Sequence, residues 1–499
     1  MKQIKKIFKI FIVVFLGLGL TNCEEPLKTE IYGEFAPNNG PASEGFMEGL
    51  LNGVYAEFQL NGATGRDFIY FSDFSGDHLY NERGGLSRVT AFVLNWNWDS
   101  QNPSWFREGF WSQPYQAIRN ANAFLEVVED SELSDIQKKQ WTAEVRFMRA
   151  TMYSFMYNLF GPVPLRTSSN DEPALGRATK EEMLNFIETE LAESAEDLPL
   201  QGEQFGRATK GAAYAVLTKH YLNTKNWTKV VEYSNLIDGL GKYSLYTAGE
   251  NPHRDLFKPS FETIENETIF SYAVTPLISS TANAIMSHSY PESNYKSFVN
   301  GDDVKLPNQS ISGTKNRVYD HFYNSFDPND DRKKQIINQY INTNGDLIIQ
   351  EPNKNSSFKY WPDPEMDAWR SGHDFRVVRY ADILLSRAEA LNEINGPTQT
   401  AIDLINEVRA RAKATLLNLA DFGSKEALRD AILDERGWEF HFEGKRREDL
   451  IRHGKFVSSK RNHPVHPVPS AEEFRVLIPI PQAEIDANPA LKGQQNPGY

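Results

Sequence analysis

The chain has 499 residues, of which 53 are Lys or Arg and 67 are Asp or Glu, and its net charge is −14. This acidic balance argues against nucleic acid as a partner, because such binding depends on neutralising phosphates with basic side chains. Apolar residues make up 40% of the chain, enough for a globular core, and the length favours one large helical assembly or two closely packed lobes. Cys23 is the only cysteine, so the chain cannot form an internal disulfide.

The N-terminus has the pattern of an export signal. Four lysines lie within residues 1–9, and residues 10–20 are almost wholly apolar. A basic segment followed by a short apolar run predicts a secretory signal peptide over residues 1–22. The apolar run is shorter than the roughly 20 residues that a membrane-spanning helix needs. A buried helix is the alternative interpretation, but no polar face interrupts the run.

Residues 20–23, Leu-Thr-Asn-Cys, resemble a bacterial lipobox. That resemblance implies that Cys23 is diacylated on its sulfur and becomes the new N-terminus, and two or more acyl chains anchor a protein stably in a bilayer. Glu24 and Glu25 follow at once, and acidic residues at this place resemble the surface-export signal of Bacteroidetes lipoproteins. Residues 23–42 contain several Pro, Asn and Gly residues and are predicted to form a flexible, lipidated tether.

Helical periodicity begins after the tether. Residues 43–57 predict a helix with Ser43 as its N-cap, and residues 111–128 predict a second helix. A third helix is indicated by apolar residues at helical spacing over 145–159. The Gly-Pro pair at 161–162 ends it, because Gly caps a helix and Pro cannot continue one. The Met and aromatic side chains of this helix are interpreted as core rather than as a cofactor site.

Two segments have the pattern of helix–turn–helix units. The first pairs residues 212–222 with 227–237, and the second pairs residues 381–391 with 400–412. Small Ala residues and short turns resemble the helix pairs of tetratricopeptide repeats. The two units begin about 170 residues apart, so the sequence shows no tandem period. A last helix is predicted over residues 425–443.

Residues 241–375 differ from the helical parts on either side. They are rich in Asn, Ser, Pro, Gly and aromatic residues, with short apolar bursts such as 268–274. Residues 339–349 predict a β-hairpin that turns at Asn344-Gly345. Loops on a rigid scaffold often carry binding function, so we expect the distinguishing chemistry of the chain in this insertion and in loops like it.

Several sequence motifs resemble those of the SusD/RagB family of outer-membrane nutrient-binding lipoproteins. The motifs occur in the order that the family has and cover nearly the whole mature chain. They lie at residues 144–150, 159–165, 207–213, 379–385, 388–390, 405–411, 435–440, 442–446 and 449–450, and in the closing phrase at 477–499.

The resemblance implies a mostly α fold. Its scaffold consists of four tetratricopeptide-like helix pairs, on which long irregular loops and minor β-hairpins pack. One SusD-like domain then covers residues 43–499, with a helical part at 43–240, the loop-rich insertion at 241–375, and a C-terminal helical part and strap at 376–499. The four prolines and the final Asn-Pro-Gly-Tyr of residues 477–499, the C-terminal strap, suit an ordered, non-helical segment that ties the chain end to the scaffold.

For function, the resemblance implies a cell-surface lipoprotein without catalytic activity that captures an oligosaccharide or polysaccharide. It also implies delivery of that glycan to a SusC-like TonB-dependent barrel in the outer membrane, where the lipid on Cys23 anchors the protein facing the medium. Three alternatives stay open. They are a RagB-like member that binds peptides or glycopeptides, a glycoside hydrolase, and a tetratricopeptide adaptor with no small ligand.

Glycan capture requires aromatic rings as apolar platforms and polar side chains that hydrogen-bond hydroxyl groups. Two polar, aromatic stretches provide both, at residues 73–99 and 359–374. Family sites vary in position, so the candidates come from these stretches and not from a motif. The alternative is that the Trp residues only fasten loops to the scaffold. The predicted glycan-binding residues are Trp96, Trp98, Trp361, Trp369 and Tyr360 as platforms, and Tyr80, Asp77 and Arg370 as polar partners.

Three glutamates, at 435, 439 and 443, recur every four residues and therefore share one helix face. A glycosidase needs two carboxylates that flank one bond, which makes this face a candidate active site. Arg436, Arg446 and Arg447 are interleaved with the glutamates, however, and favour a structural ion-pair network.

Two other motifs suggest metal ligands weakly. Residues 327–331, Asp-Pro-Asn-Asp-Asp, resemble a calcium loop but lack the Gly and the closing Glu of an EF-hand, so a structural turn is favoured. His463 and His466 form an H-x-x-H pattern between prolines, which is typical of a loop. We therefore predict no cofactor, with a structural Ca²⁺ as the open alternative.

Overall fold

The computed structural model of the chain describes residues 42–58, 65–101, 105–259, 266–274, 283–299, 315–366 and 370–499. The predicted signal peptide, Cys23 and the tether up to residue 41 lie outside the described residues, as does Trp369.

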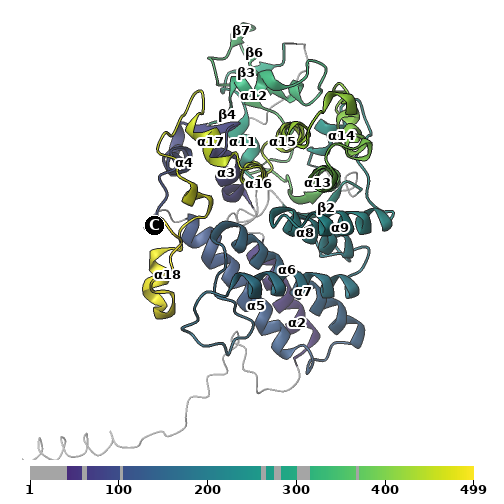
Figure 1. The fold of residues 1–499 in the computed structure, drawn as a ribbon, viewed down its shortest axis with the longest axis vertical. Coiled ribbons are helices and arrows are strands. Elements are labelled where there is room, and N and C mark those ends of the chain that lie inside the picture. Colours follow the sequence, from purple (N-terminus) through teal and green to yellow (C-terminus); the bar gives the residue numbers. More distant parts are fainter. Residues whose placement is uncertain are drawn as a thin grey trace, which may run out of the picture. The chain divides into compact units, whose positions relative to one another are not determined.

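Four helix pairs form the scaffold of the described residues, and they follow one another from the bottom to the upper right of Figure 1. Each pair also contacts the next, through α5 with α6, α7 with α8, and α9 with α13. The predicted fold class, a mostly α scaffold of tetratricopeptide-like pairs, is confirmed. The pairs are α2 (Glu44–Phe58) with α5 (Gln113–Val127), α6 (Asp135–Phe160) with α7 (Lys180–Asp197), α8 (Lys210–Asn223) with α9 (Trp227–Gly239), and α13 (Tyr380–Asn395) with α14 (Gln399–Arg411).

The helix ends follow the capping residues of the sequence. The Ser43 hydroxyl accepts a hydrogen bond from the Phe46 backbone amide at the start of α2, as predicted. At the start of α6, Ser134 and Gln137 form a reciprocal capping box. Gly161 ends α6 with a φ of 71°, a conformation that residues with a Cβ rarely adopt.

The helix predicted over 111–128 begins inside a π-helix. This element, η1 (Trp105–Ser112), leads directly into α5, whose first turn carries Pro114. π-Helices are rare and occur mostly as short pieces at functional sites. The junction of η1 and α5 is therefore a place where the scaffold departs from regular geometry.

The insertion between α9 and α13 contains short helices and small antiparallel sheets. Strand β2 (Thr268–Tyr272) pairs with β9 (Phe375–Arg379), and β9 runs directly into α13. Because α9 nevertheless packs against α13, the stack of pairs continues across the insertion. This explains why the sequence shows no tandem period. The other short elements are α10 (Pro252–Leu256), α11 (Ile285–Ser289), β3 (Tyr295–Ser297), β4 (Lys315–Val318), α12 (Asp320–Ser325), η2 (Lys333–Gln335), β5 (Ile336–Ile337) and β8 (Ser356–Ser357).

The predicted β-hairpin is confirmed as β6 (Gln339–Asn342) and β7 (Leu347–Ile349), with Gln339 opposite Ile349. Gly345 has a φ of 89° in the turn, and the Asn342 side chain accepts hydrogen bonds from the backbone amides of Asn344 and Asp346. The hairpin joins β3 in a three-stranded sheet at the top of Figure 1.

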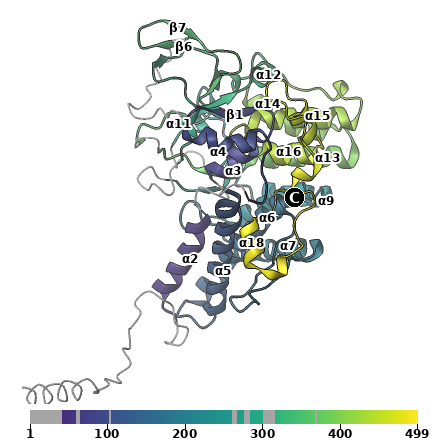
Figure 2. The same cartoon turned by 90° about the vertical axis from the view of Figure 1, so that its left-hand side faces the viewer.

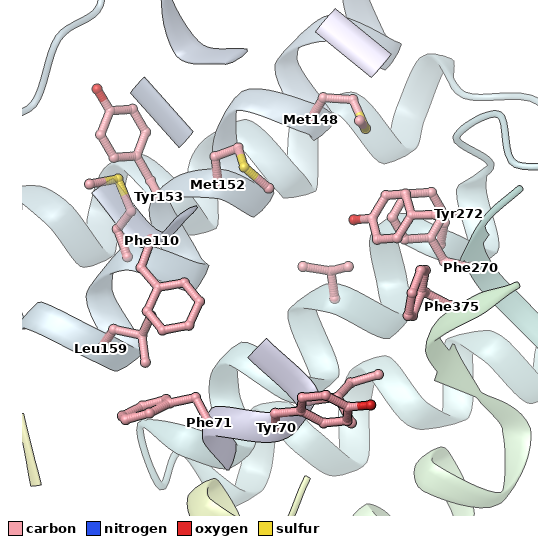
Figure 3. Packing of buried hydrophobic residues seen from close by; sticks show 14 of the residues in the cluster. Tyr70, Phe71, Phe110, Met148, Met152, Tyr153, Leu159, Phe270, Tyr272 and Phe375 are labelled. Carbon is pink, nitrogen blue, oxygen red and sulfur yellow. The ribbon is translucent and has the colours of Figure 1, made fainter. Parts of the chain in front are cut away.

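The main core lies where α6 faces the β2–β9 sheet and α3 (Arg66–Phe74). Figure 3 shows Met148 and Met152 of α6 on one side of this region, with Phe270, Tyr272 and Phe375 of the sheet on another. The Met148 and Met152 side chains are at most 1% exposed. Their interpretation as core is confirmed.

The last long helix, α15 (Lys425–Phe440), ends three residues before the predicted end at 443. His441 has a ψ of 139°, outside the helical range, and Phe442 has a φ of 60°. The fully buried Phe442 ring therefore leaves the helix direction. Cationic side chains bind the backbone carbonyl of Glu439 there: Lys359 Nζ lies 2.8 Å from it and Arg379 3.0 Å. Tertiary donors thus replace the next helical turn.

The C-terminal strap is ordered and lies against the scaffold (Figure 2). It follows α16 (Arg446–Arg452) and α17 (Phe456–Arg461), and it contains α18 (Gln482–Ala487) and the short helix η5 (Pro489–Leu491). The Asn496 amide donates to the backbone carbonyls of Phe160, at 3.0 Å, and Ile478, at 2.8 Å. The interpretation of this segment as a strap is confirmed, but the expectation that it is non-helical is wrong, because α18 and η5 lie within it.

The described segments contain no helix that combines the length and the apolar composition needed to cross a membrane.

Candidate functional site

A cleft of about 1230 Å³ opens beside Trp361. Its walls come from the segment 244–251, α10, η2 and the C-terminal end of α14. A site for a small ligand commonly measures a few hundred to about 1,000 Å³, so this cleft has room for several sugar rings.

Trp361 is the predicted platform residue that this cleft contains. Its backbone amide donates to the Phe257 carbonyl at 3.1 Å, which fixes the indole at the cleft wall. The Phe298 ring lies nearly parallel to the indole, with a centroid distance of 6.0 Å and an interplanar angle of 19°. The Arg254 guanidinium lies 4.9 Å from the indole centroid, a cation–π contact. Trp361 is partly exposed, so this aromatic assembly is open to the cleft.

Several charged side chains of the cleft have a partner of opposite charge. Asp331 binds Lys334 at 2.6 Å and Lys413 at 2.8 Å, and the lysine side chains are 67% and 59% exposed at the rim. Burial alone raises the pKa of Asp331, but the hydrogen bonds from the two lysines outweigh it and lower the pKa. Arg254 donates to Asp255 at 3.1 Å. The basic and acidic residues that line the cleft nearly cancel in charge. They are Arg254, Lys334, Arg411 and Lys413, and Glu250, Asp331 and Glu407.

A buried network of ion pairs lies next to the cleft and includes one of its lining residues. Arg411, which lines the cleft, binds Glu267 at 2.9 Å and also binds Glu439. Arg379 joins the same two carboxylates, at 2.8 Å and 2.5 Å. The network therefore ties α14 to β9 and α15.

The three predicted glutamates of α15 and its end belong to this network. The side chain of Glu435 binds Arg332 at 2.7 Å and Arg409 at 2.6 Å. Burial raises the pKa of Glu439, but Arg411 and Arg379 outweigh it and hold the pKa well below its usual value. In the same way, Arg379 and Lys359 lower the pKa of Glu443 to about 2. Each carboxylate is buried and bound by cations, so the ion-pair interpretation is confirmed. The predicted partners are wrong, however: Arg436 binds Asp382 and Asp449, Arg446 binds Asp77, and Arg447 donates to backbone carbonyls.

The structure contradicts the predicted exposure of Trp96 and Trp98, which are 1% and 0% exposed. Trp96 donates its indole N–H to the Ser75 carbonyl at 3.0 Å and packs on Phe456. Trp98 donates to the Tyr499 hydroxyl at 2.9 Å. The alternative interpretation, that such residues fasten a loop to the scaffold, describes both. Asn95 and Asn97 are exposed, but the two indoles turn inward, Trp96 against α17 and Trp98 against the C-terminal strap.

Three other predicted site residues are also engaged inside the protein. Tyr360 is 4% exposed, and its hydroxyl donates to the Phe442 carbonyl at 3.0 Å. Tyr80 is 7% exposed and stacks on Tyr319. The two carboxylate oxygens of Asp77 bind Arg446 at 2.7 and 3.0 Å. These contacts leave them little capacity for a ligand, which corrects our expectation.

The last two predicted residues are Arg370 and Trp369. Arg370 is partly exposed but is not among the residues that line the cleft. Trp369 lies outside the described residues. Of the eight predicted residues, the structure thus places Trp361 alone among the lining residues that it describes.

The two weak metal motifs have partners within the chain. In the segment 327–331, the Asp327 side chain accepts a hydrogen bond from the Asn329 backbone amide, and Asp330 forms an ion pair with Arg332. His463 accepts two backbone amides at Nδ1 and donates from Nε2 to the Asp77 carbonyl. His466 lies against the Tyr319 hydroxyl at 2.5 Å. Among the described residues, no group of three acidic, His or Cys side chains has the arrangement of a metal site.

The cleft also contains residues that the sequence did not single out. Arg254 and Phe298 contact Trp361, and Asn251 caps α10 by accepting the Arg254 amide at 3.0 Å. The pair Asn251-Pro252 is a helix-start signal that could have located α10. No local signal shows that a helix start at 251 lies against an aromatic residue at 361.

Two family models match the chain and together cover most of the part after the tether. The model described as "Starch-binding associating with outer membrane" matches residues 43–222. The model of the SusD family matches residues 266–499.

Two curated relatives match over nearly their full length. The chain is 28% identical to "SusD-like protein P25" of Formosa agariphila, over 99% of this chain and 100% of that protein. It is 26% identical to "Starch-binding protein SusD" of Bacteroides thetaiotaomicron, over 100% of this chain and 99% of that protein.

Solved structures share the fold. A "Laminarin binding SusD-like protein" superposes with a TM-score of 0.75 at 24% identity, over 92% of this chain and 100% of that chain. Surface glycan-binding protein A from Bacteroides thetaiotaomicron, solved in complex with laminarihexaose, gives a TM-score of 0.72 at 20% identity, over 91% of this chain and 100% of that chain.

Proposed function

This chain belongs to the SusD/RagB family, and we propose that it binds an oligosaccharide in the cleft beside Trp361. The observation that carries the proposal is the open assembly of the Trp361 indole, the Phe298 ring and the Arg254 guanidinium. Flat apolar faces of this kind receive the C–H faces of sugar rings, and the rings lose little rotamer entropy on binding. The relatives named for binding starch, laminarin and laminarihexaose support a glucan-like ligand.

The polar lining of the cleft supplies hydrogen-bond donors and acceptors without a large net charge. Its basic and acidic residues nearly balance, whereas the whole chain carries a net charge of −14. A neutral oligosaccharide needs donors and acceptors but no countercharge, so this balance favours a neutral glycan over a charged peptide.

The proposed activity is binding without bond cleavage. A glycoside hydrolase needs one carboxylate that can donate a proton and a second that can act as nucleophile or base. Glu439 and Glu443 are buried, and neighbouring cations hold the pKa of each below its usual value. Both are therefore ionised and already bound by cationic side chains, and neither can reach a glycan in the cleft.

The proposed location follows from the N-terminus and from the family. A lipid on Cys23 would hold the protein at the outer membrane facing the medium, and the name of one matching family model refers to association with that membrane. There the bound glycan would pass to a SusC-like TonB-dependent barrel. Replacing Cys23 by Ala and fractionating cells tests the anchor: the variant should leave the membrane fraction, and unchanged membrane retention would contradict the role of Cys23.

The binding proposal is tested with the soluble chain that lacks residues 1–23. Trp361→Ala should reduce affinity for the bound glucan by about tenfold to a hundredfold, as expected for loss of a buried aromatic contact worth a few kcal/mol. Trp438→Ala is the matched control, because Trp438 is partly exposed and also stacks with an arginine, Arg409, but does not line the cleft. Titration calorimetry with laminarin and starch oligosaccharides gives the affinities. Equal affinity and equal stoichiometry for the wild type and Trp361→Ala would reject the site, and release of reducing ends would reject binding without cleavage.

A further inference from the structure

A second cleft, of about 530 Å³, lies between η1 and α5 on one side and the C-terminal strap on the other. The segment 164–173, which follows α6, completes its wall. This cleft shares no lining residue with the cleft beside Trp361. From the strap, Glu484, Asn488 and Leu491 line it, so the strap forms a cleft wall in addition to fastening the chain end.

Two aromatic side chains are fixed at this second cleft. The Trp111 and Tyr115 rings are 5.3 Å apart at 56°, and Trp111 also packs edge-on against Phe160. The Tyr115 hydroxyl donates to the Pro164 carbonyl at 2.8 Å, which holds the ring against the wall. Trp111 is nearly covered, whereas Tyr115 is partly exposed. Tyr115 is therefore the ring that a ligand can reach.

Three polar side chains accompany Tyr115 on the same helix face. Ser112, Gln116 and Arg119 follow the helical spacing i, i+4 and i+7, and all three line the cleft. Within the described part of the chain, these three side chains have no hydrogen-bond or ion-pair partner. Ser112 is the last residue of the π-helix, so the irregular turn places Trp111 and Ser112 at the cleft.

We propose that this second cleft is an additional carbohydrate-binding site. A sugar ring packs against Tyr115, while the Ser112 hydroxyl, the Gln116 amide and the Arg119 guanidinium bind its hydroxyl groups. The proposal rests on the proposed function, because it assigns the same ligand class to both clefts. Its consequence is multivalency: a polysaccharide long enough to occupy both clefts is retained more strongly than a short oligosaccharide, which occupies them independently.

The test uses the soluble chain lacking residues 1–23 and a glucan that the wild type binds. Gln116→Ala/Arg119→Ala removes two exposed polar side chains whose loss leaves the core intact. Gln204→Ala/Lys180→Ala is the matched control, since it removes an exposed Gln and an exposed cation outside both clefts. Calorimetry with a short oligosaccharide reports the stoichiometry, and affinity electrophoresis through the polysaccharide reports retention.

The wild type and the control should bind two short oligosaccharides per chain. Both Gln116→Ala/Arg119→Ala and Trp361→Ala should bind one, and each should lose about tenfold or more in polysaccharide retention. Wild-type stoichiometry and retention in Gln116→Ala/Arg119→Ala would overturn the second site and leave the first intact. Unchanged binding in Trp361→Ala, with loss in Gln116→Ala/Arg119→Ala, would instead reject the first site and keep the second.

Discussion

The indole N–H of Trp98 donates a hydrogen bond to the hydroxyl of Tyr499 at 2.9 Å, which links a loop near the start of the fold to the last residue of the chain. The Tyr499 hydroxyl in turn donates to the Leu477 carbonyl at 2.8 Å. Trp98 is fully buried, so its N–H depends on this partner. The strap thus explains why a Trp in a polar stretch belongs to the core.

Tyr499→Phe removes both hydrogen bonds and keeps the ring, which packs edge-on against Phe474 at 4.9 Å. A buried donor left without its partner costs about 1–3 kcal/mol. We expect the free energy of unfolding in urea to fall by that amount, with glycan affinity unchanged. A variant as stable as the wild type would show that the Trp98–Tyr499 bond contributes nothing to the strap.

Two Gly→Ala substitutions should change the free energy of unfolding in opposite directions. Gly161 has a φ of 71°, and an added Cβ would lie 3.3 Å from a Leu477 methyl group, so Gly161→Ala should destabilise by about 1–3 kcal/mol. Gly49 lies in the middle of α2 with nothing within 4 Å of an added Cβ, so Gly49→Ala should stabilise by about 1 kcal/mol. Thermal unfolding of the two variants provides the comparison, and a shared sign would contradict the assigned backbone roles.

Glu439→Gln tests the ion network. It removes the charge that Arg411, Arg379 and Arg332 surround, and breaking a buried ion pair from one side costs about 3–5 kcal/mol. We expect a large drop in the free energy of unfolding. Glu426→Gln, a change at an exposed glutamate of α15, should leave stability within about 0.5 kcal/mol of the wild type. Equal effects of the two substitutions would contradict the structural role of Glu439.

Asp374 should make stability fall as the pH rises from about 4 to about 7. Burial raises the pKa of this carboxyl to about 7, although Arg376 and the Val274 amide oppose the shift. The folded protein therefore holds a proton that the unfolded chain releases at lower pH, and this contribution to stability is lost as pH rises through about 7. Asp374→Asn keeps the acceptor for Val274 and cannot ionise. Urea unfolding at several pH values should show the variant gaining stability relative to the wild type from about pH 4 to pH 7, with no further change above pH 7. A constant difference across that range would refute the assigned pKa.

The sequence was sufficient for the parts of the fold that depend on local chemistry. Helical periodicity and capping residues predicted α2, α6 and the two helix–turn–helix units, because Ser43 and Gly161 act within one turn of their own helix. The end of α15 was predicted too late, because Phe442 turns out of the helix in response to tertiary contacts with Lys359 and Arg379.

The candidate site was less predictable, because exposure is set by segments distant in sequence. Trp96 and Trp361 lie in similarly polar, aromatic stretches, yet one is 1% exposed and the other opens onto a cleft. The difference comes from α17, which covers Trp96, and from Arg254 and Phe298, which flank Trp361. No spacing in the sequence encodes those contacts.

The other functional inferences depend on the proposal that the cleft beside Trp361 holds the glycan. A crystal structure of the soluble chain with a bound oligosaccharide tests it most directly. We predict a sugar ring in van der Waals contact with the Trp361 indole, within about 4 Å, and hydroxyl groups bound by residues of the same cleft. Oligosaccharide bound elsewhere on the protein, with the Trp361 cleft empty, would contradict it.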